Sequence, residues 1–333
     1  MIRSFVFTTQ GKLQSRDPQA SAMTGLLADA NVFLWVDLEK ATAEETSSVL
    51  EGVFHFHPLS IEDCVLPSPL PKVEEYTPKE GDLFKQPYLF MVIHAVDYHR
   101  QDGCFGTDEL NFFLGKNFLV TYHDLPLKSV STVAERAING TMGIARAPDR
   151  IAHSLLDTLV DNYKPALDEF AQEISDLEQM ALQMPNKETL NKILRVKKEV
   201  LHLRQIMGPQ REVLSRFAAG EFKVVRPHLV PYFRDVYDSL FHISELAHTY
   251  ADWLTGILQV YLNMSANQTS EVVKVLTLIT VITTPLMMIG TWYGMNFHDM
   301  PELDYKHAYP IAAAAMVIST AGTYLYFKRK KWF

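Results

Sequence analysis

Residues 272–292 read VVKVLTLITVITTPLMMIGTW, and residues 309–327 read YPIAAAAMVISTAGTYLYF. Each apolar stretch has about 20 residues and would form a helix roughly 30 Å long, which matches the hydrocarbon thickness of a bilayer. We therefore predict two membrane-spanning helices near the C-terminal end, joined by a loop at residues 293–308.

Charged residues beside the two predicted spans indicate their orientation. The tail at residues 328–333 reads KRKKWF, and positive residues next to a span stay on the cytoplasmic side. The joining loop carries three acidic residues and one lysine. We therefore expect the loop outside and both termini in the cytoplasm, with the protein in the inner (plasma) membrane. Residues 1–7 lack the apolar core of a signal peptide, so insertion is expected to depend on the C-terminal spans.

The composition excludes some classes of partner. The chain has 333 residues and a formal net charge of −8. Nucleic-acid binding calls for a basic stripe, so this balance argues against a nucleic-acid partner and is compatible with attracting cations. Cys64 and Cys104 are the only cysteines and form no C-x-x-C pair, so neither a disulfide framework nor a cysteine zinc site is predicted.

Enzyme motifs are absent from the sequence. Gly115-Lys116 lacks the preceding glycine and the following Ser or Thr of a P-loop, and neither H-E-x-x-H nor G-x-S-x-G occurs. We therefore do not expect an enzyme.

The front of the chain, residues 1–147, is predicted to be an α/β cytoplasmic domain with a sheet. Segments rich in aromatic and β-branched residues predict strands at residues 32–36, 88–93, 110–114 and 117–122, the last two joined as a hairpin. Helical pieces are expected around residues 43–54 and 58–65. The segment 64–87 is rich in proline and charge, so part of it is predicted to be a surface loop.

Helical periodicity begins at Pro148. Residues 148–228 predict an antiparallel helix pair, one helix running to the break at Pro185-Asn186 and the other from residue 187 to about 219. Residues 229–271 predict a stalk helix that continues without a joint into the first span. The expected fold is thus an α/β domain followed by a long stalk helix continuous with the first of two transmembrane helices.

Several motifs resemble those of the CorA family of magnesium transporters. The loop between the spans reads YGMN at residues 293–296 and MPEL at 300–303. The other matching segments are HPLSIED at 57–63, PKVE at 71–74 and VPYFRDVYD at 230–238. The resemblance covers nearly the whole chain, although residues 77–87 look like a local insertion.

A polar stripe runs along the first span and the stalk below it. Its members recur at steps of three and four residues and so share one helix face: Ser270, Val273, Thr277, Thr280, Thr284, Met287 and Thr291. This pattern favours a pore lining, and because one helix cannot enclose a pore, it calls for several copies around an axis. The alternative is a lipid-facing stripe whose threonines bond to their own helix.

The resemblance implies further roles along this path. It implies five copies, and it matches Val273 and Leu276 to an apolar constriction that gates the pore. Ser270 and Thr284 depart from the family pattern, which has asparagine and methionine there. Both substitutions make the lining smaller.

The outer mouth is predicted at Tyr293, Gly294, Met295 and Asn296. Gly294 lets the chain leave the helix, and Asn296 offers a neutral oxygen to the waters of Mg²⁺, an ion that dehydrates reluctantly. The alternative is a plain capping turn. Asp299 and Glu302 are candidates for an outer acidic collar, or ordinary loop acids.

The resemblance also implies regulatory divalent-ion sites between neighbouring subunits. Asp63 and Asp235 match the family's pair, and Glu62 and Asp157 are candidates for a second site, with Asp161 one turn from Asp157. Without the resemblance, all would be interpreted as surface carboxylates.

The leading hypothesis is a pentameric CorA-type channel for Mg²⁺, and also for Co²⁺ or Ni²⁺, in which Mg²⁺ is both substrate and regulatory ligand. One alternative is a ZntB-like zinc transporter, coupled to protons, because imidazole suits zinc and the chain has 12 histidines, including His55 and His57. A membrane-anchored scaffold is the third.

Overall fold

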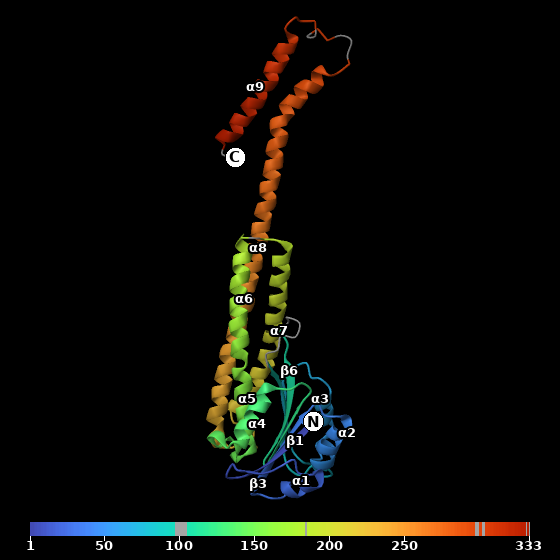
Figure 1. The fold of residues 1–333 in the computed structure, drawn as a ribbon, viewed down its shortest axis with the longest axis vertical. Helices are drawn as coiled ribbons and strands as arrows, with labels where there is room; N and C mark the ends of the chain where they lie inside the picture. Colours follow the sequence, from blue (N-terminus) through green and yellow to red (C-terminus); the bar gives the residue numbers. More distant parts are fainter. Residues whose placement is uncertain (97–104, 184, 297–299, 302–303, 331, 333) are drawn as a thin grey trace. The chain divides into compact units, whose positions relative to one another are not determined.

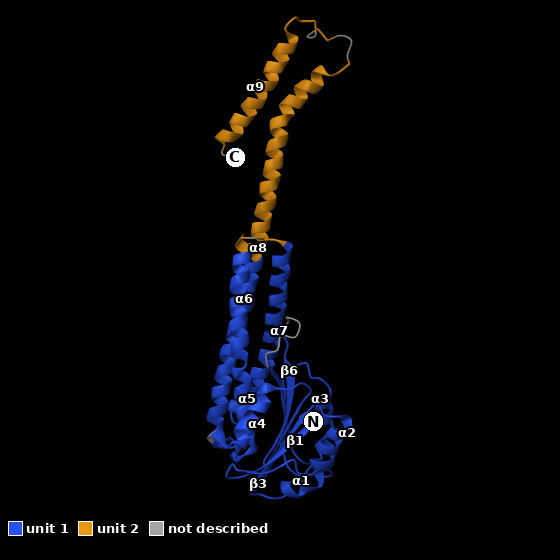
Figure 2. Cartoon of the chain, in the orientation of Figure 1, with its two compact units in different colours: residues 1–180, 187–258 blue, residues 181–186, 259–333 orange. Residues whose placement is uncertain are grey.

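The structure is a computed structural model, and it describes residues 1–333 except 97–104, 184, 297–299, 302–303, 331 and 333. It contains two compact units (Figure 2). The first comprises residues 1–180 and 187–258, and the second comprises residues 181–186 and 259–333.

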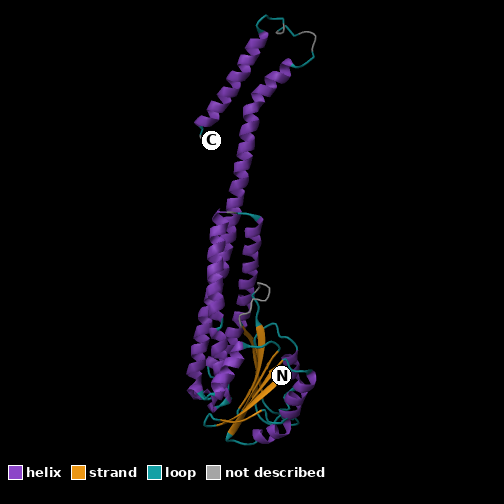
Figure 3. Cartoon of the chain, viewed as in Figure 1, coloured by secondary structure: helices purple, strands orange, loops and turns teal. Residues whose placement is uncertain are grey.

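The first unit contains a β-sheet, which lies at one end of the unit (Figure 3). It has seven strands in the order β2-β1-β3-β7-β6-β5-β4. The strands are β1 Ile2–Thr8, β2 Leu13–Arg16, β3 Val32–Glu39, β4 Lys72–Tyr76, β5 Tyr88–Ala95, β6 Asp108–Gly115 and β7 Phe118–His123. Neighbouring strands pair antiparallel except β3 with β7, which is parallel. The four predicted strands are confirmed, whereas β4 lies within the segment predicted to be partly loop.

Both faces of the sheet are covered by helices (Figure 1). One layer is formed by α1 Ala20–Leu27, α2 Ala43–Ser47, the π-helical turn η1 Ser48–Val53 and α3 Pro58–Val65, and α4 Lys128–Ile138 and α5 Pro148–Asp161 lie on the other side. The helical predictions at residues 43–54 and 58–65 are confirmed. Alternate residues of β3 explain the layering, because Leu34 and Val36 belong to the core under the first layer.

The helix α3 shows how local sequence sets an element boundary. Pro58 occupies its first turn, where a missing N–H costs nothing, and the Nδ1 atom of His57 accepts a hydrogen bond from the backbone N–H of Leu59 at 3.2 Å. This cap fixes the start of the helix that carries Glu62 and Asp63.

The helix predicted to run from Pro148 to Pro185 is wrong in one respect, because two helices occupy this segment. The helix α5 ends before Asn162, and α6 begins at Tyr163 and runs to Gln183. The hydroxyl of Tyr163 is buried and donates a hydrogen bond to the carbonyl of His94 at 2.6 Å. Pro165 fits the first turn of the new helix, where its missing N–H is tolerated.

The helix α7, Lys187–Ala218, confirms the second helix of the predicted pair. After it, a short 3₁₀ turn at Pro227–Leu229, η4, leads into α8, Val230–Tyr293. The helix α8 has 64 residues and is therefore about 96 Å long. The predicted continuity of stalk and first span is confirmed.

The two ends of α8 differ in burial. In the first unit it buries an apolar face at helical spacing that includes Phe233, Leu240 and Leu254. Beyond Tyr261, the only buried apolar side chain among the described residues of α8 is Leu278. The same helix is thus a packed core element first and an exposed apolar rod afterwards.

The second unit also contains α9, Ala308–Arg329. Both α8 and α9 are long and apolar enough to cross a membrane. Only 6% of the apolar window of α8 and 0% of that of α9 is buried, which is unlike the core helix of a soluble protein. Two candidate membrane spans are therefore present at the predicted places.

Candidate functional site

The predicted stripe lies on the exposed part of α8. Its members share one face of the helix and are all solvent-exposed in the single chain: Ser270, Val273, Thr277, Thr280, Thr284, Met287 and Thr291. Leu276, next to this face, is 63% exposed. Near its start, Ser270, Val273 and Thr277 line a hollow together with Trp332. The exposed side chains of the stripe are otherwise open, in the described part of the chain, to a neighbouring molecule or to lipid.

Three of the four threonines of the stripe donate their hydroxyl protons to their own helix. Thr277 Oγ1 donates to the carbonyl of Val273 at 2.7 Å, and Thr284 Oγ1 donates to that of Thr280 at 2.7 Å. Thr280 Oγ1 donates to the carbonyl of Leu276 at 2.9 Å. A hydroxyl has one donor and two acceptor lone pairs. The stripe therefore presents acceptor oxygens, which suit a cation or the hydrogens of its water shell.

The turn at the end of α8 is built around Gly294. Its N–H donates to the carbonyls of Gly290 at 3.1 Å and Thr291 at 3.2 Å. Gly294 does not take a positive φ, so left-handed backbone is not the reason for a glycine here. A Cβ at this position would lie 3.1 Å from the carbonyl oxygen of Gly290, so the glycine permits a close backbone approach.

Asn296 follows this turn and is exposed. The predicted loop of Tyr293, Gly294, Met295 and Asn296 thus lies directly at the end of the helix that carries the stripe. The two collar candidates, Asp299 and Glu302, lie outside the described residues.

The acids of α3 lie in different surroundings. Asp63 accepts a hydrogen bond from Lys72 Nζ at 2.5 Å, and its side chain is 39% exposed. Glu62 lines a hollow of about 700 Å³ together with His55 and His57. Within the described ranges, this hollow contains no three metal-ligating atoms within 4.8 Å of one another.

The structure brings Asp157 and Asp235 together. Asp157 lies half-buried on α5, and Asp235 lies exposed near the start of α8. Burial raises the pKa of Asp157, as do the charges of Asp161 and Asp235, whereas His153 and Lys164 act in the opposite direction. The negative charges of Asp161 and Asp235 therefore both act on the carboxylate of Asp157, while Asp161 itself pairs with Lys164 at 2.7 Å.

The four predicted regulatory acids do not form one site within a single chain. Among the residues that the structure describes, the only group of three ligating side chains with atoms within 4.8 Å is Asp37, Glu39 and His123. Glu62 and Asp63 on α3 and Asp157 and Asp235 on α5 and α8 are two separate half-sets.

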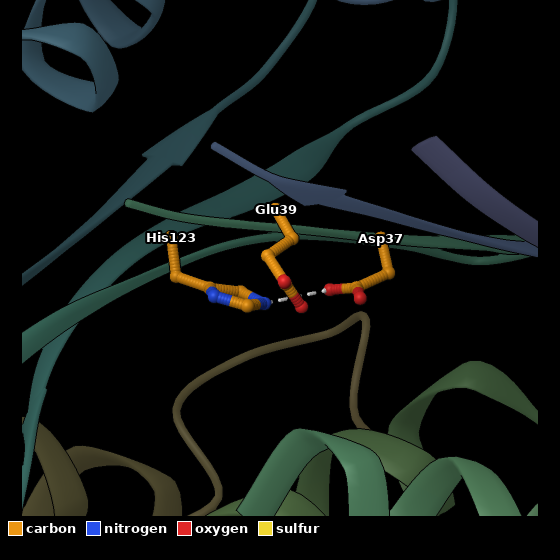
Figure 4. A group of neighbouring side chains, drawn as sticks. All are labelled: Asp37, Glu39 and His123. Atoms are coloured by element: carbon orange, nitrogen blue, oxygen red, sulfur yellow. Dashed lines mark hydrogen bonds and ion pairs between the residues drawn. The ribbon is translucent and has the colours of Figure 1, made fainter. Parts of the chain in front are cut away.

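The group of Asp37, Glu39 and His123 was not predicted (Figure 4). The side chains come from β3 and β7, whose parallel register places Glu39 beside His123. The signal in the sequence is a charged residue, Asp37, inside an otherwise apolar strand. What it pairs with depends on strand register, which local sequence does not specify.

The hydrogen bonds of Asp37 and His123 indicate that this group is an ion-pair network rather than a metal site. The Nδ1 atom of His123 lies 2.6 Å from the carbonyl of Leu125 and Nε2 lies 3.2 Å from Asp37 Oδ1, so both nitrogens face acceptors. Arg3 donates to Asp37 Oδ2 at 2.6 Å, and Thr121 donates to Oδ1 at 2.6 Å. The cations Arg3 and His123 thus balance the two carboxylates without a metal.

Burial and pairing move the two pKa values of this network in opposite directions. Burial by itself would raise the pKa of Asp37, but His123, Thr121 and Arg3 lower it below its ordinary value. Burial by itself would lower the pKa of His123, but Asp37 raises it. Each partner therefore stabilises the charged form of the other.

Comparisons with known proteins extend these observations. A family described as "CorA-like Mg2+ transporter protein" matches residues 30–329. The chain is 34% identical over 306 residues to the cobalt/magnesium transport protein CorA of Thermotoga maritima, covering 91% of this chain and 84% of that protein. The complete structure of the CorA magnesium transporter of Methanocaldococcus jannaschii matches with a TM-score of 0.82 at 18% identity, covering 100% of this chain and 99% of the other.

A more distant structure is that of the ZntB cytoplasmic domain from Vibrio parahaemolyticus. It matches with a TM-score of 0.56 at 12% identity and covers 71% of this chain and 88% of the other. At this identity the likeness shows a shared fold of the soluble part and nothing more.

The His123 network predicts a pH-dependent stability of the sheet. Folding raises the pKa of His123 above its ordinary value of 6.5. The contribution of His123 to the free energy of unfolding is therefore complete below pH 6.5 and is lost as the pH rises through the pKa of the folded state. The thermal midpoint of the full-length protein, followed by tryptophan fluorescence in detergent, should therefore exceed that of His123→Gln by a margin that shrinks from about pH 6 to about pH 9.

The exposed histidine variant His242→Gln serves as the control and should follow the wild type throughout. A wild-type margin over His123→Gln that stays constant across this pH range would contradict the assignment of His123 as a cation.

Proposed function

The chain belongs to the family of CorA-like Mg²⁺ transporter proteins, and we propose that it is a channel that admits Mg²⁺ into the cell. The observation that carries this proposal is the exposed stripe of α8, which runs through a candidate membrane span and is followed, after the end of the helix, by Asn296. An anchor or a scaffold has no use for such a stripe. Members of this family are transporters rather than enzymes.

The channel is an assembly of several identical chains. One helix cannot enclose a pore, and closed cyclic symmetry lets copies of α8 surround a common axis. The family resemblance implies five copies. In this arrangement the stripe faces the axis, α9 packs outside, and the termini lie in the cytoplasm of an inner-membrane protein.

The chemistry of the stripe supports passage of a hydrated cation. Mg²⁺ keeps its waters because it dehydrates reluctantly, and those waters donate hydrogen bonds. The threonine oxygens accept them, since their own protons are already donated to carbonyls of α8. Val273 and Leu276 form an apolar ring on the cytoplasmic side, where a narrow constriction can gate by dewetting.

The electrochemical gradient supplies the driving force. A divalent cation that crosses a potential of about 100 mV inward gains about 4.6 kcal/mol, twice the value for a single charge. At the outer entrance, Asn296 contributes an amide oxygen that accepts hydrogen bonds from the ion's waters and leaves them bound to the ion. A carboxylate would instead displace those waters.

Closure depends on divalent cations bound between neighbouring chains. The half-set on α5 and α8 carries mutually repelling carboxylates, and the half-set on α3 has one acid held by Lys72. A cation bridging Asp235 of one chain and Asp63 of the next relieves that repulsion and ties the chains together. When intracellular Mg²⁺ falls, the bridge is lost and the stalks are free to move.

The selectivity assignment predicts that Asn296→Ala abolishes Mg²⁺ influx into liposomes that hold the purified protein. The reason is that the outer ring loses its acceptor oxygens while the assembly, held elsewhere, keeps its size. Flux is measured with a Mg²⁺-sensitive dye, and Zn²⁺ flux is measured with and without a proton gradient. Asn139→Ala, an exposed site on the α/β domain, is the matched control and should transport normally.

Mg²⁺ entry by the Asn296→Ala protein at the wild-type rate would remove the loop from the selectivity mechanism. Zn²⁺ entry that rises with the proton gradient, with little Mg²⁺ flux, would replace this proposal by a zinc transporter of the ZntB type.

The gating assignment predicts that the double variant Asp63→Asn with Asp235→Asn needs at least about tenfold more Mg²⁺ for half-maximal closure. The loss of both carboxylates removes the ligands of the bridge. The Mg²⁺ concentration for half-maximal closure is measured as the concentration on the cytoplasmic side that inhibits half of the current. The control is Asp168→Asn with Asp176→Asn, two exposed acids of α6. An unchanged half-inhibitory concentration in the first double variant would exclude these residues from closure.

A further inference from the structure

The first unit contains a cleft of about 910 Å³ that none of the proposed transport steps uses. It lies at one end of the sheet, where the start of β3, the β6–β7 turn, the start of α5 and the segment between α7 and α8 come together. Its volume falls in the range of small-molecule sites, about 300–1,000 Å³.

Three basic side chains on the lining of this cleft have no ion-pair partner in the described part of the chain: Lys116, Arg146 and Lys223. All three are exposed. The whole protein has a net charge of −8, whereas three separate segments bring unpaired cations to this cleft, so the local charge has the opposite sign.

The acids of the same lining do not neutralise these cations. Asp149 is buried and is held by Arg226, whose Nε and Nη2 donate to its two carboxyl oxygens at 2.8 and 2.6 Å. Glu221 pairs with Arg216 at 2.9 Å. Glu75 is the remaining acid of the lining, so the cleft keeps a surplus of positive charge.

The start of α5 adds to this surplus. Ala147 is the N-cap residue and provides no side-chain hydrogen bond to the first turn, so the positive end of the helix dipole opens onto the cleft. The carboxylate of Asp149, which lies in that turn, is directed to Arg226 and not to the backbone N–H groups of the first turn.

Apolar side chains form another part of the wall. Leu27, Val32, Phe33 and Val224 line the cleft on the side of α1, β3 and the α7–α8 segment. An inorganic anion would leave these side chains without a partner, whereas a ring attached to a phosphate would contact both kinds of surface.

We propose that this cleft binds a phosphorylated small molecule with a ring of nucleobase size, the chemical class of nucleoside monophosphates. The phosphate contacts Lys116, Arg146 and Lys223 through charge-assisted hydrogen bonds, and the ring lies against the apolar wall. The inference is independent of the transport proposal, because all its residues lie in the first unit and its test measures binding and not flux.

The test is calorimetric titration of the full-length protein in detergent, at a fixed concentration of free Mg²⁺, with adenosine monophosphate, adenosine and inorganic phosphate as separate probes. The variant is Lys116→Ala with Lys223→Ala, which keeps the fold because both side chains are exposed and unpaired. The matched control is Lys128→Ala with Lys198→Ala, two exposed lysines that do not line the cleft.

The expected result is saturable binding of adenosine monophosphate to the wild type and to the control. The Lys116/Lys223 variant should bind it at least about tenfold more weakly. Adenosine and inorganic phosphate should each bind about tenfold more weakly than the nucleotide, because each engages only one wall. The proposal is overturned if the nucleotide binds no better than either fragment, or if the two double variants bind it equally.

Discussion

Inside a bilayer, a backbone N–H or C=O finds no water, so every such group of a spanning segment must be satisfied within the protein. The helix α8 meets most of this constraint because it is one helix from Val230 to Tyr293, although Pro285 has no N–H to donate to the carbonyl of Val281. Its threonines follow the same rule, because their hydroxyls donate to carbonyls of the same helix. The polarity that remains is a row of acceptor oxygens on one face. A lipid tail cannot use those oxygens, whereas a hydrated cation can.

The same helix links two kinds of environment. Its first part is held by buried apolar side chains such as Phe233 and Leu240, so it is a packed part of the first unit. Its second part exposes its apolar surface in the single chain. Asp235 lies near the beginning of α8, and Gly294 directly follows its last residue. The acids near Asp235 therefore lie on or beside the same helix that carries the stripe, which is the basis of the proposed closure.

Much of this fold follows from local sequence, and the errors have identifiable causes. The boundaries of α3 follow from Pro58 and the His57 cap, and the two candidate spans follow from length and apolar composition. The break at Asn162 was missed because apolar periodicity continues across it, and the buried bond from Tyr163 to His94 joins residues far apart in sequence. The strand β4 was missed because its five residues lie in a segment rich in proline and charge.

The candidate site was predictable only where its residues share one element. The stripe lies on α8 and follows from residue spacing, whereas the turn at Gly294, directly after α8, follows from the family motif. The cluster of Asp157, Asp161 and Asp235 requires α5 to lie beside α8, and the network of Asp37 with His123 requires the register of β3 against β7.

The most direct test of the central claim, that the stripe faces an axis shared by several copies, is oxidative cross-linking in native membranes. The comparison uses Thr280→Cys and Ile282→Cys, which lie on nearly opposite faces of α8, in a protein whose Cys64 and Cys104 are replaced by serine. The account predicts covalent dimers for Thr280→Cys and few for Ile282→Cys. Equal or stronger linking through Ile282→Cys would contradict it.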